Sequence, residues 1–270
     1  MALFLLSVLI FAFSVVHRQK QNQAQTPQDF FISSQDIQTT PTPSPSPKTN
    51  LEVENIFQKD IPNLEGNWAI VIKDLNTQKT YAYNQDKIFV SASLYKLAVM
   101  WAVFQEIENG KVQYENVDDL LEAMITVSDN PSAIALAESI GWGKIDRLMA
   151  QEGMEDFNLT TDDGPFVNAK TIETLLERIY KKTAVSKDAS ERMSDLLFAQ
   201  EINNRIPALL PKDTKVGHKT GEIDNFRHDV GIVQGIKSDY LFIFMSQSVP
   251  EKAAETIAQL SQQIYASLEK

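Results

Sequence analysis

The stretch Ser91-Ala-Ser-Leu-Tyr-Lys96 places a serine and a lysine three residues apart, at Ser93 and Lys96, where a helical pattern begins. Side chains at i and i+3 share one face of a helix, so we expect the hydroxyl and the amine to lie side by side. Such a pair can form an activated nucleophile, in which the amine takes the proton and the oxygen attacks a carbonyl carbon. The lysine can act as a base only if burial or nearby positive charge lowers its pKa from about 10.4.

The helix that follows Ser93 is apolar on almost all sides up to Ile107, which predicts a central, buried helix. It is preceded by two β-rich runs, 67–73 and 79–83, and by a short amphipathic segment, 51–61, that Pro62 closes. Two alternating runs and an amphipathic helix end the chain. Further helices are predicted at 116–127, 131–140, 143–151, 170–182 and 187–200, the late strands at 228–236 and 239–246, and the last helix at 250–268.

This order of elements predicts an α+β fold, in which terminal helices cover an antiparallel sheet and a helical lobe is inserted between the strands. The sheet lobe is expected to comprise residues 51–90 and 216–270, and the helical lobe residues 91–215. Together they form one expected domain, 51–270.

Charge and composition exclude several classes of function. The net charge of −11 argues against nucleic acid as a partner, because binding phosphates needs clustered Lys and Arg. The absence of cysteine excludes disulfides, a thiol nucleophile and a thiolate metal site. We expect no metal, no cofactor and a monomer.

The first 18 residues contain a continuous apolar run, Ala2 to Val16, followed by His17 and Arg18. The run is shorter than the ~18 residues of a membrane span, and it fits a signal peptide or a membrane anchor. Residues 19–50 are rich in Gln, Thr, Pro and Ser, which predicts a disordered linker. The domain is therefore expected to be extracytoplasmic, secreted or tethered, with membrane contact only through the N-terminal segment, whose cleavage stays open.

Two short motifs follow the serine-lysine pair. Ser128-Asp-Asn130 is predicted in a turn between helices, and Lys219-Thr-Gly221 is predicted to precede the late strands. Each alone has a structural explanation, since the first suits a helix N-terminus before Pro131 and the second suits a surface turn. The order S-x-x-K, S-D-N, K-T-G is nevertheless the set used by β-lactamases and penicillin-binding proteins.

With these motifs the sequence resembles the class A β-lactamase and penicillin-binding serine acyltransferase superfamily, and in particular its compact class A-like branch. Residues 203–207 (NNRIP), 218–221 (HKTG) and 227–232 (RHDVGI) add to the resemblance, which spans most of residues 51–270. It implies a β-lactamase/transpeptidase-like fold.

The resemblance also implies a role for each matched residue. The nucleophile would pass its proton to the lysine, the S-D-N serine would protonate the leaving nitrogen, and the K-T-G segment would bind a substrate carboxylate. Backbone N–H groups of Ser93 and of Glu222 or Ile223 would form the oxyanion hole, and Arg227, or else Arg205, would be a second cation for the carboxylate. The implied catalytic residues are Ser93, Lys96, Ser128, Asn130 and Lys219, and the implied substrate-binding residues are Thr220, Gly221, Ile223 and Arg227.

One part of the family pattern is missing. Class A β-lactamases carry an E-x-x-L-N motif whose glutamate activates the deacylating water, and the short segment 154–169 has no such motif. Glu155, Asp162 and Asp163 are candidates to replace that glutamate, although acids in a loop are more simply explained as solvated groups. The missing motif puts rapid deacylation in doubt.

The two histidines of the domain, His218 and His228, raise the alternative of a Ser-His-Asp site or a metal site. Neither a G-x-S-x-G elbow nor paired ligand spacing accompanies them. We expect His218 to pack beside K-T-G and His228 to hydrogen-bond between strands.

Three functions follow, each with a small-molecule β-lactam or a cell-wall peptide as its ligand. The first is a β-lactamase-type serine hydrolase that forms an acyl-enzyme at Ser93. The second is a D-alanyl-D-alanine carboxypeptidase or a slowly deacylating penicillin-binding protein. The third, from another class, is a non-catalytic cell-wall binding or sensor module.

Overall fold

The computed structural model describes residues 50–162 and 164–270. The predicted segment 1–18 and, apart from Asn50, the predicted linker lie outside the described residues, as does Asp163. The strands are β1 (Asn67–Asp74), β2 (Thr80–Tyr83), β3 (Ile88–Val90), β4 (Phe166–Asn168), β5 (Lys215–Ile223), β6 (Phe226–Gln234) and β7 (Asp239–Gln247). The α-helices are α1 (Leu51–Asn55), α2 (Tyr95–Glu108), α3 (Asp118–Thr126), α4 (Asn130–Ile140), α5 (Trp142–Gln151), α6 (Ala169–Tyr180), α7 (Lys187–Phe198) and α8 (Pro250–Leu268).

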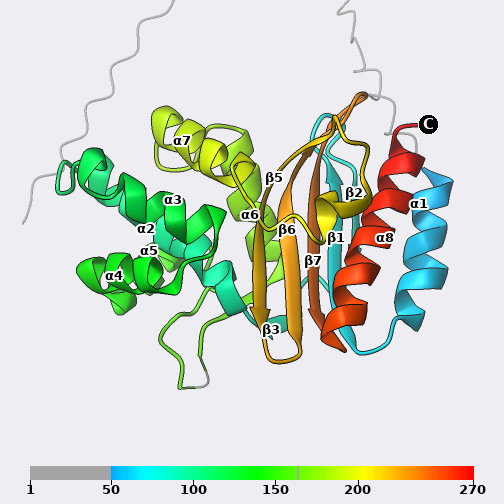
Figure 1. The fold of residues 1–270 in the computed structure, drawn as a ribbon, viewed down its shortest axis with the longest axis horizontal. Helices are drawn as coiled ribbons and strands as arrows, with labels where there is room; N and C mark the ends of the chain where they lie inside the picture. The colour runs from blue at the N-terminus through cyan, green and yellow to red at the C-terminus, as the bar shows by residue number, and fades with distance from the viewer. Residues whose placement is uncertain (1–49, 163) are drawn as a thin grey trace, which may run out of the picture. The chain divides into compact units, whose positions relative to one another are not determined.

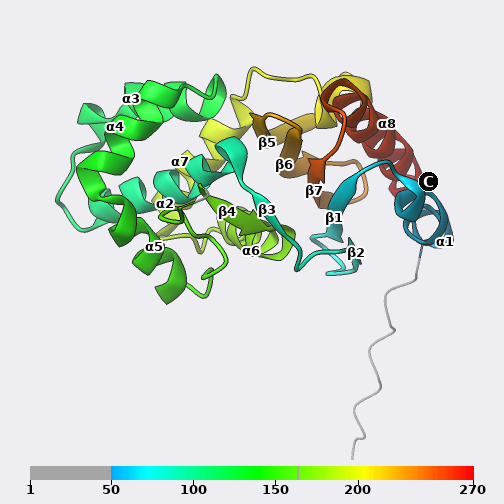
Figure 2. The ribbon, with the colours of Figure 1, turned by 90° about the horizontal axis from the view of Figure 1, so that it is seen from below.

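A five-stranded antiparallel sheet, in the order β2-β1-β7-β6-β5, separates two apolar cores. Side chains alternate between the faces of a strand, so Trp68, Ile70 and Ile72 of β1 join the core with α1 and α8. Ala69 and Val71 join the other core, which contains α2 and α6. Figure 1 and Figure 2 show α1 and α8 on one face of the sheet and the other helices beyond its opposite face. The predicted α+β architecture is confirmed.

Helix α2 is the buried centre of the helical region. Every residue from Lys96 to Phe104 is buried, as its apolar sequence predicts. The helix ends where Gly110 adopts a φ of 70°, a left-handed conformation that glycine adopts without steric cost. Helices α3 to α8 begin and end within a few residues of their predicted bounds. No helix of the described ranges is long and apolar enough to cross a membrane.

Three local predictions are wrong. Lys219-Thr-Gly221 lies inside the edge strand β5 instead of preceding the strands. The short strands β3 and β4 were not predicted, and they pair as a second, two-stranded sheet. The amphipathic segment starts as α1 but continues as a π-helix, Ile56–Asp60, and a 3₁₀ helix, Ile61–Asn63.

Candidate active site

Ser93 lies in a 3₁₀ helix, Ala92–Leu94, that leads directly into α2. The preceding residue, Ala92, has a φ of 47°, a left-handed conformation that costs a residue with a side chain about 1–3 kcal/mol. Ser93 is half-buried at the N-terminal end of α2, where backbone N–H groups lack partners within the helix. The segment therefore presents the hydroxyl at a point suited to stabilising negative charge.

Lys96 is fully buried one turn further along, and its side chain is held by the turn before α4. Its Nζ donates hydrogen bonds to Ser128 O at 2.5 Å, Asn130 Oδ1 at 2.7 Å and Ser128 Oγ at 3.2 Å. These three acceptors account for the three protons of an ammonium group. Burial lowers the pKa of Lys96 to about 8. The negative charge of Asp129 raises this pKa and partly offsets the effect of burial.

The S-D-N turn is both a helix cap and part of the site. Asp129 is the N-cap of α4 and accepts a hydrogen bond from Ser132 N at 2.7 Å, with Pro131 in the first turn. Ser128 has a φ of 59°, so its hydroxyl and its carbonyl both reach Lys96. The exposed Asn130 uses its oxygen for Lys96, which leaves its NH₂ group available as a donor to a ligand.

Lys219 reaches the same turn from β5. Its buried Nζ donates to Ser128 Oγ at 2.8 Å and to Thr220 O at 2.8 Å. Burial, and after it the positive charge of Lys96, lowers the pKa of Lys219 to about 7. Ser128 Oγ thus accepts from two amines, and both amines titrate close to neutral pH.

The K-T-G segment lies close to the segment that contains Ser93. A side chain at Gly221 would place its Cβ 3.2 Å from Ser91 O and 3.2 Å from Leu94 Cγ. A Cβ at these distances would be unusually tight, so a side chain here would require the neighbouring atoms to shift by a few tenths of an ångström. The next residues, Glu222 and Ile223, are exposed at the end of β5. An oxyanion hole that includes the N–H group of one of these two residues stays a prediction.

A buried polar network supports β5 from the side opposite to Lys219. His218 bonds Asp229 Oδ1 through Nδ1 at 2.7 Å and Asn203 Oδ1 through Nε2 at 3.1 Å. Asp229 also accepts from Ile206 N at 2.8 Å, and both Asp229 and His218 are fully buried. The negative charge of Asp229 raises the pKa of Lys219, in the direction opposite to the effect of burial. This network was not predicted from the sequence, although the motif RHDVGI contains Asp229.

His228 bonds between strands, as expected. Its Nδ1 accepts from Ser246 N of β7 at 3.1 Å, so Nε2 carries the proton and donates to Val90 O of β3 at 2.9 Å. Burial lowers the pKa of His228 to about 4. Because the imidazole of His228 is neutral and both of its nitrogens are hydrogen-bonded to backbone groups, His228 has a structural role.

The two candidate arginines differ in their surroundings. Arg205 is 1% exposed, and its Nη1 donates to His228 O at 3.3 Å. Its positive charge lowers the pKa of Lys219, so Arg205 is electrostatically close to K-T-G. Arg227 Nη1 donates to Asp224 O and Phe226 O at the β5–β6 turn. Which of the two arginines binds a substrate carboxylate stays a prediction.

The loop acids lie apart from the amines. Glu155 and Asp162 are exposed, and Lys96 and Lys219 donate no hydrogen bond to either of them. The backbone of the loop passes close to the Ser93 segment, because Ser91 N donates to Pro165 O at 2.8 Å. Within residues 50–162 and 164–270, no three His, Asp or Glu side chains are grouped so as to hold a metal ion.

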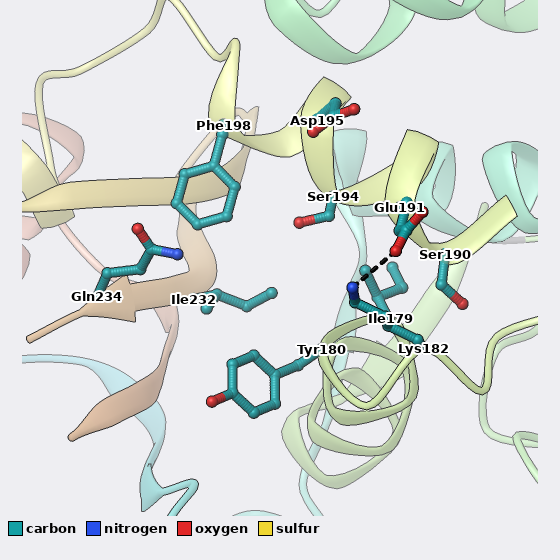
Figure 3. A pocket seen from close by; sticks show the side chains of 10 residues that line it. All are labelled: Ile179, Tyr180, Lys182, Ser190, Glu191, Ser194, Asp195, Phe198, Ile232 and Gln234. Atoms are coloured by element: carbon teal, nitrogen blue, oxygen red, sulfur yellow. Dashed lines mark hydrogen bonds and ion pairs between the residues drawn. The ribbon is translucent and has the colours of Figure 1, made fainter. Parts of the chain in front are cut away.

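A cavity of about 400 Å³ lies between α6, α7 and β6, away from these motifs. Figure 3 shows Phe198, Ile232 and Tyr180 around it, with the ion pair Lys182–Glu191 at 2.6 Å to one side. None of the predicted catalytic residues lines it. The predicted site is therefore defined by its hydrogen bonds and not by this cavity.

Comparison with known proteins identifies the class. A model of the beta-lactamase enzyme family matches residues 52–117 and 112–268. The chain belongs to the beta-lactamase enzyme family, and the resemblance noted from its motifs is confirmed. It is accordingly a hydrolase-type enzyme of the β-lactamase fold. No curated protein sequence matches it.

Solved structures share the fold at low sequence identity. PBP-A is 22% identical with a TM-score of 0.74, over 82% of this chain and 96% of that one. A PBP-A mutant solved as an acyl-enzyme complex with penicillin G is 20% identical with a TM-score of 0.75, over 84% and 99%. A class A β-lactamase representative from Bacteroides cellulosilyticus is 19% identical with a TM-score of 0.73, over 82% and 99%.

Proposed function

We propose that this protein forms an acyl-enzyme at Ser93 with β-lactams and hydrolyses their amide bond. The observation that carries the proposal is the pair of buried amines, Lys96 and Lys219, on either side of Ser128 Oγ. A buried amine with a pKa of about 8 is a base that can take a serine proton near neutral pH.

The proposed acylation proceeds in balanced steps. Ser93 Oγ attacks the carbonyl carbon while its proton passes to neutral Lys96, and backbone N–H groups stabilise the oxyanion. The carbon–nitrogen bond then breaks, and Ser128 Oγ gives its proton to the leaving nitrogen. Ser128 is reprotonated by an amine to which it is already hydrogen-bonded. Water completes the cycle by attacking the ester, which releases the acid and restores Ser93.

Substrate binding is assigned to groups on and beside β5. The positive charges of Lys219 and Arg205, with the Thr220 hydroxyl, would bind a substrate carboxylate in an otherwise acidic protein. The NH₂ group of Asn130 would hold the substrate's amide. In this proposal Arg227 is an outer cation at the turn.

A second candidate is a slowly deacylating penicillin-binding protein or D-alanyl-D-alanine carboxypeptidase. It is favoured by one observation, namely that Glu155 and Asp162 are exposed and that neither accepts a hydrogen bond from Lys96 or Lys219. In either case we propose an extracytoplasmic location, which the N-terminal apolar run and the linker composition support.

Intact-protein mass spectrometry after incubation with benzylpenicillin tests the proposal. Wild type is expected to gain one acyl group, and Ser93→Ala to gain none. The absence of both an adduct on wild type and any loss of benzylpenicillin from the solution would overturn the proposal and leave a non-catalytic binding module. The same adduct on Ser93→Ala would also overturn it. Decay of the adduct within minutes indicates a β-lactamase, whereas persistence for hours indicates the second candidate.

A further inference from the structure

The carboxylate of Glu222 lies between the two arginines that are candidates for the substrate carboxylate. Its Oε2 accepts a hydrogen bond from Arg205 Nη2 and lies 3.9 Å from Arg227 Nε. Glu222 and Arg227 are opposite each other in the β5–β6 register, so their side chains share a face of the sheet.

The same face carries the hydroxyl that is expected to bind the substrate. Glu222 follows Thr220 by two residues in β5, and alternate residues of a strand point to one side, about 6–7 Å apart. The negative charge of Glu222 also raises the pKa of Lys219, which shows that it acts on the buried amine. The carboxylate of Glu222 is thus positioned among the groups that are expected to bind the carboxylate of the substrate.

The side chains of Arg205 and Glu222, which form this ion pair, differ in how freely they can move. The side chain of Arg205 is 1% exposed and is fixed by His228 O, whereas the side chain of Glu222 is 60% exposed. A substrate carboxylate that approaches Arg205 therefore meets a like charge, and Glu222 must turn toward solvent to release the guanidinium. A neutral acyl donor does not compete for Arg205 and meets no repulsion.

We propose that Glu222 is a specificity-determining residue, which holds Arg205 in the substrate-free state and slows acylation by donors that carry a carboxylate relative to neutral donors. This inference rests on the proposed function of Ser93. It predicts that neutralising Glu222 selectively accelerates the anionic donors.

Benzylpenicillin and its methyl ester test the inference, because they deliver the same acyl group with and without the negative charge. Second-order acylation rates are measured by intact-protein mass spectrometry at pH 6, where Lys219, with a pKa of about 7, is mostly charged. Any change in the basicity of Lys96 affects both compounds and cancels in the ratio of the acid rate to the ester rate. We expect Glu222→Gln to raise that ratio about tenfold. This is the order of effect of removing one like charge about 6–7 Å from Thr220, where the substrate carboxylate is expected to bind.

Glu222→Ala is the second neutral variant and is expected to raise the ratio similarly, while the ester rate reports that the site is intact. Glu52→Gln is the matched control, since Glu52 lies on α1, is 54% exposed and pairs with Lys270, and Figure 1 shows α1 at the other side of the fold from the edge strand β5. Its ratio should equal that of wild type. An unchanged or lower ratio in both Glu222 variants would overturn the inference alone. The absence of both an adduct and hydrolysis with either compound on wild type would overturn the proposed function, and this inference with it.

Discussion

Raising the pH from 6 to 8 is expected to accelerate acylation of Ser93 by a neutral β-lactam ester about fiftyfold. The reason is the buried base, Lys96, whose pKa of about 8 leaves about 1% of the amine neutral at pH 6 and about half at pH 8. Above pH 8 the ester rate should level off, because the amine is then mostly neutral.

A donor with a carboxylate should follow a different profile. It also requires positive charge on Lys219, whose pKa of about 7 means that the charge is fully present at lower pH and is lost as the pH rises through 7. The product of neutral Lys96 and charged Lys219 is bell-shaped, with a maximum expected between about pH 7 and 8.

Asp129→Asn tests whether the titration of Lys96 causes the pH dependence of the ester acylation rate. The carboxylate of Asp129 raises the pKa of Lys96, and asparagine caps a helix as well as aspartate does, so α4 should remain intact. The ester profile should move to lower pH. Rates come from time courses of the mass adduct, with Ser93→Ala as the blank. An ester rate that does not change between pH 6 and 9, or a profile that moves to higher pH in Asp129→Asn, would refute Lys96 as the base.

Two further substitutions test other parts of the site. Ser128→Ala removes the hydroxyl that both amines contact, and it should lower the acylation rate constant about 10²–10⁴-fold in the same assay. A loss of less than about threefold would contradict a proton-transfer role. Asp229→Ala leaves His218 and Ile206 N without their buried acceptor, and it should lower the free energy of unfolding by about 3–5 kcal/mol in urea titration. A loss below about 1 kcal/mol would show that water replaces the carboxylate.

The sequence predicts the parts of the fold that depend on periodicity. The alternation in β6 and β7 and the amphipathic pattern of α8 arise from burial on defined faces, and these elements were predicted within a few residues. Strands β3 and β4 have three residues each, too few to show a period. Their pairing is a tertiary effect.

Strand β5 was missed for a different reason. Its sequence contains His218 and Lys219 where a buried strand normally has apolar residues, and each is paired with a side chain distant in sequence, Asp229 and Ser128 respectively. Burial of charge is therefore the property of this site that local patterns do not reveal. The left-handed Ala92, which turns the chain into Ser93, likewise has no signal in its residue type.

The groups assigned to acylation and those considered for deacylation have different structural supports. Lys96 and Lys219 are held in the buried helix α2 and in strand β5, with geometry fixed by packing on both sides. In the segment after α5, Leu159 N donates to Asp146 at 2.7 Å and Thr160 N donates to it at 3.1 Å, and Glu155 is exposed. Substitutions in that segment can therefore change the lifetime of an acyl-enzyme while leaving its rate of formation unaffected. Measuring the two rates separately shows whether this chain is a β-lactamase or a slowly deacylating penicillin-binding protein.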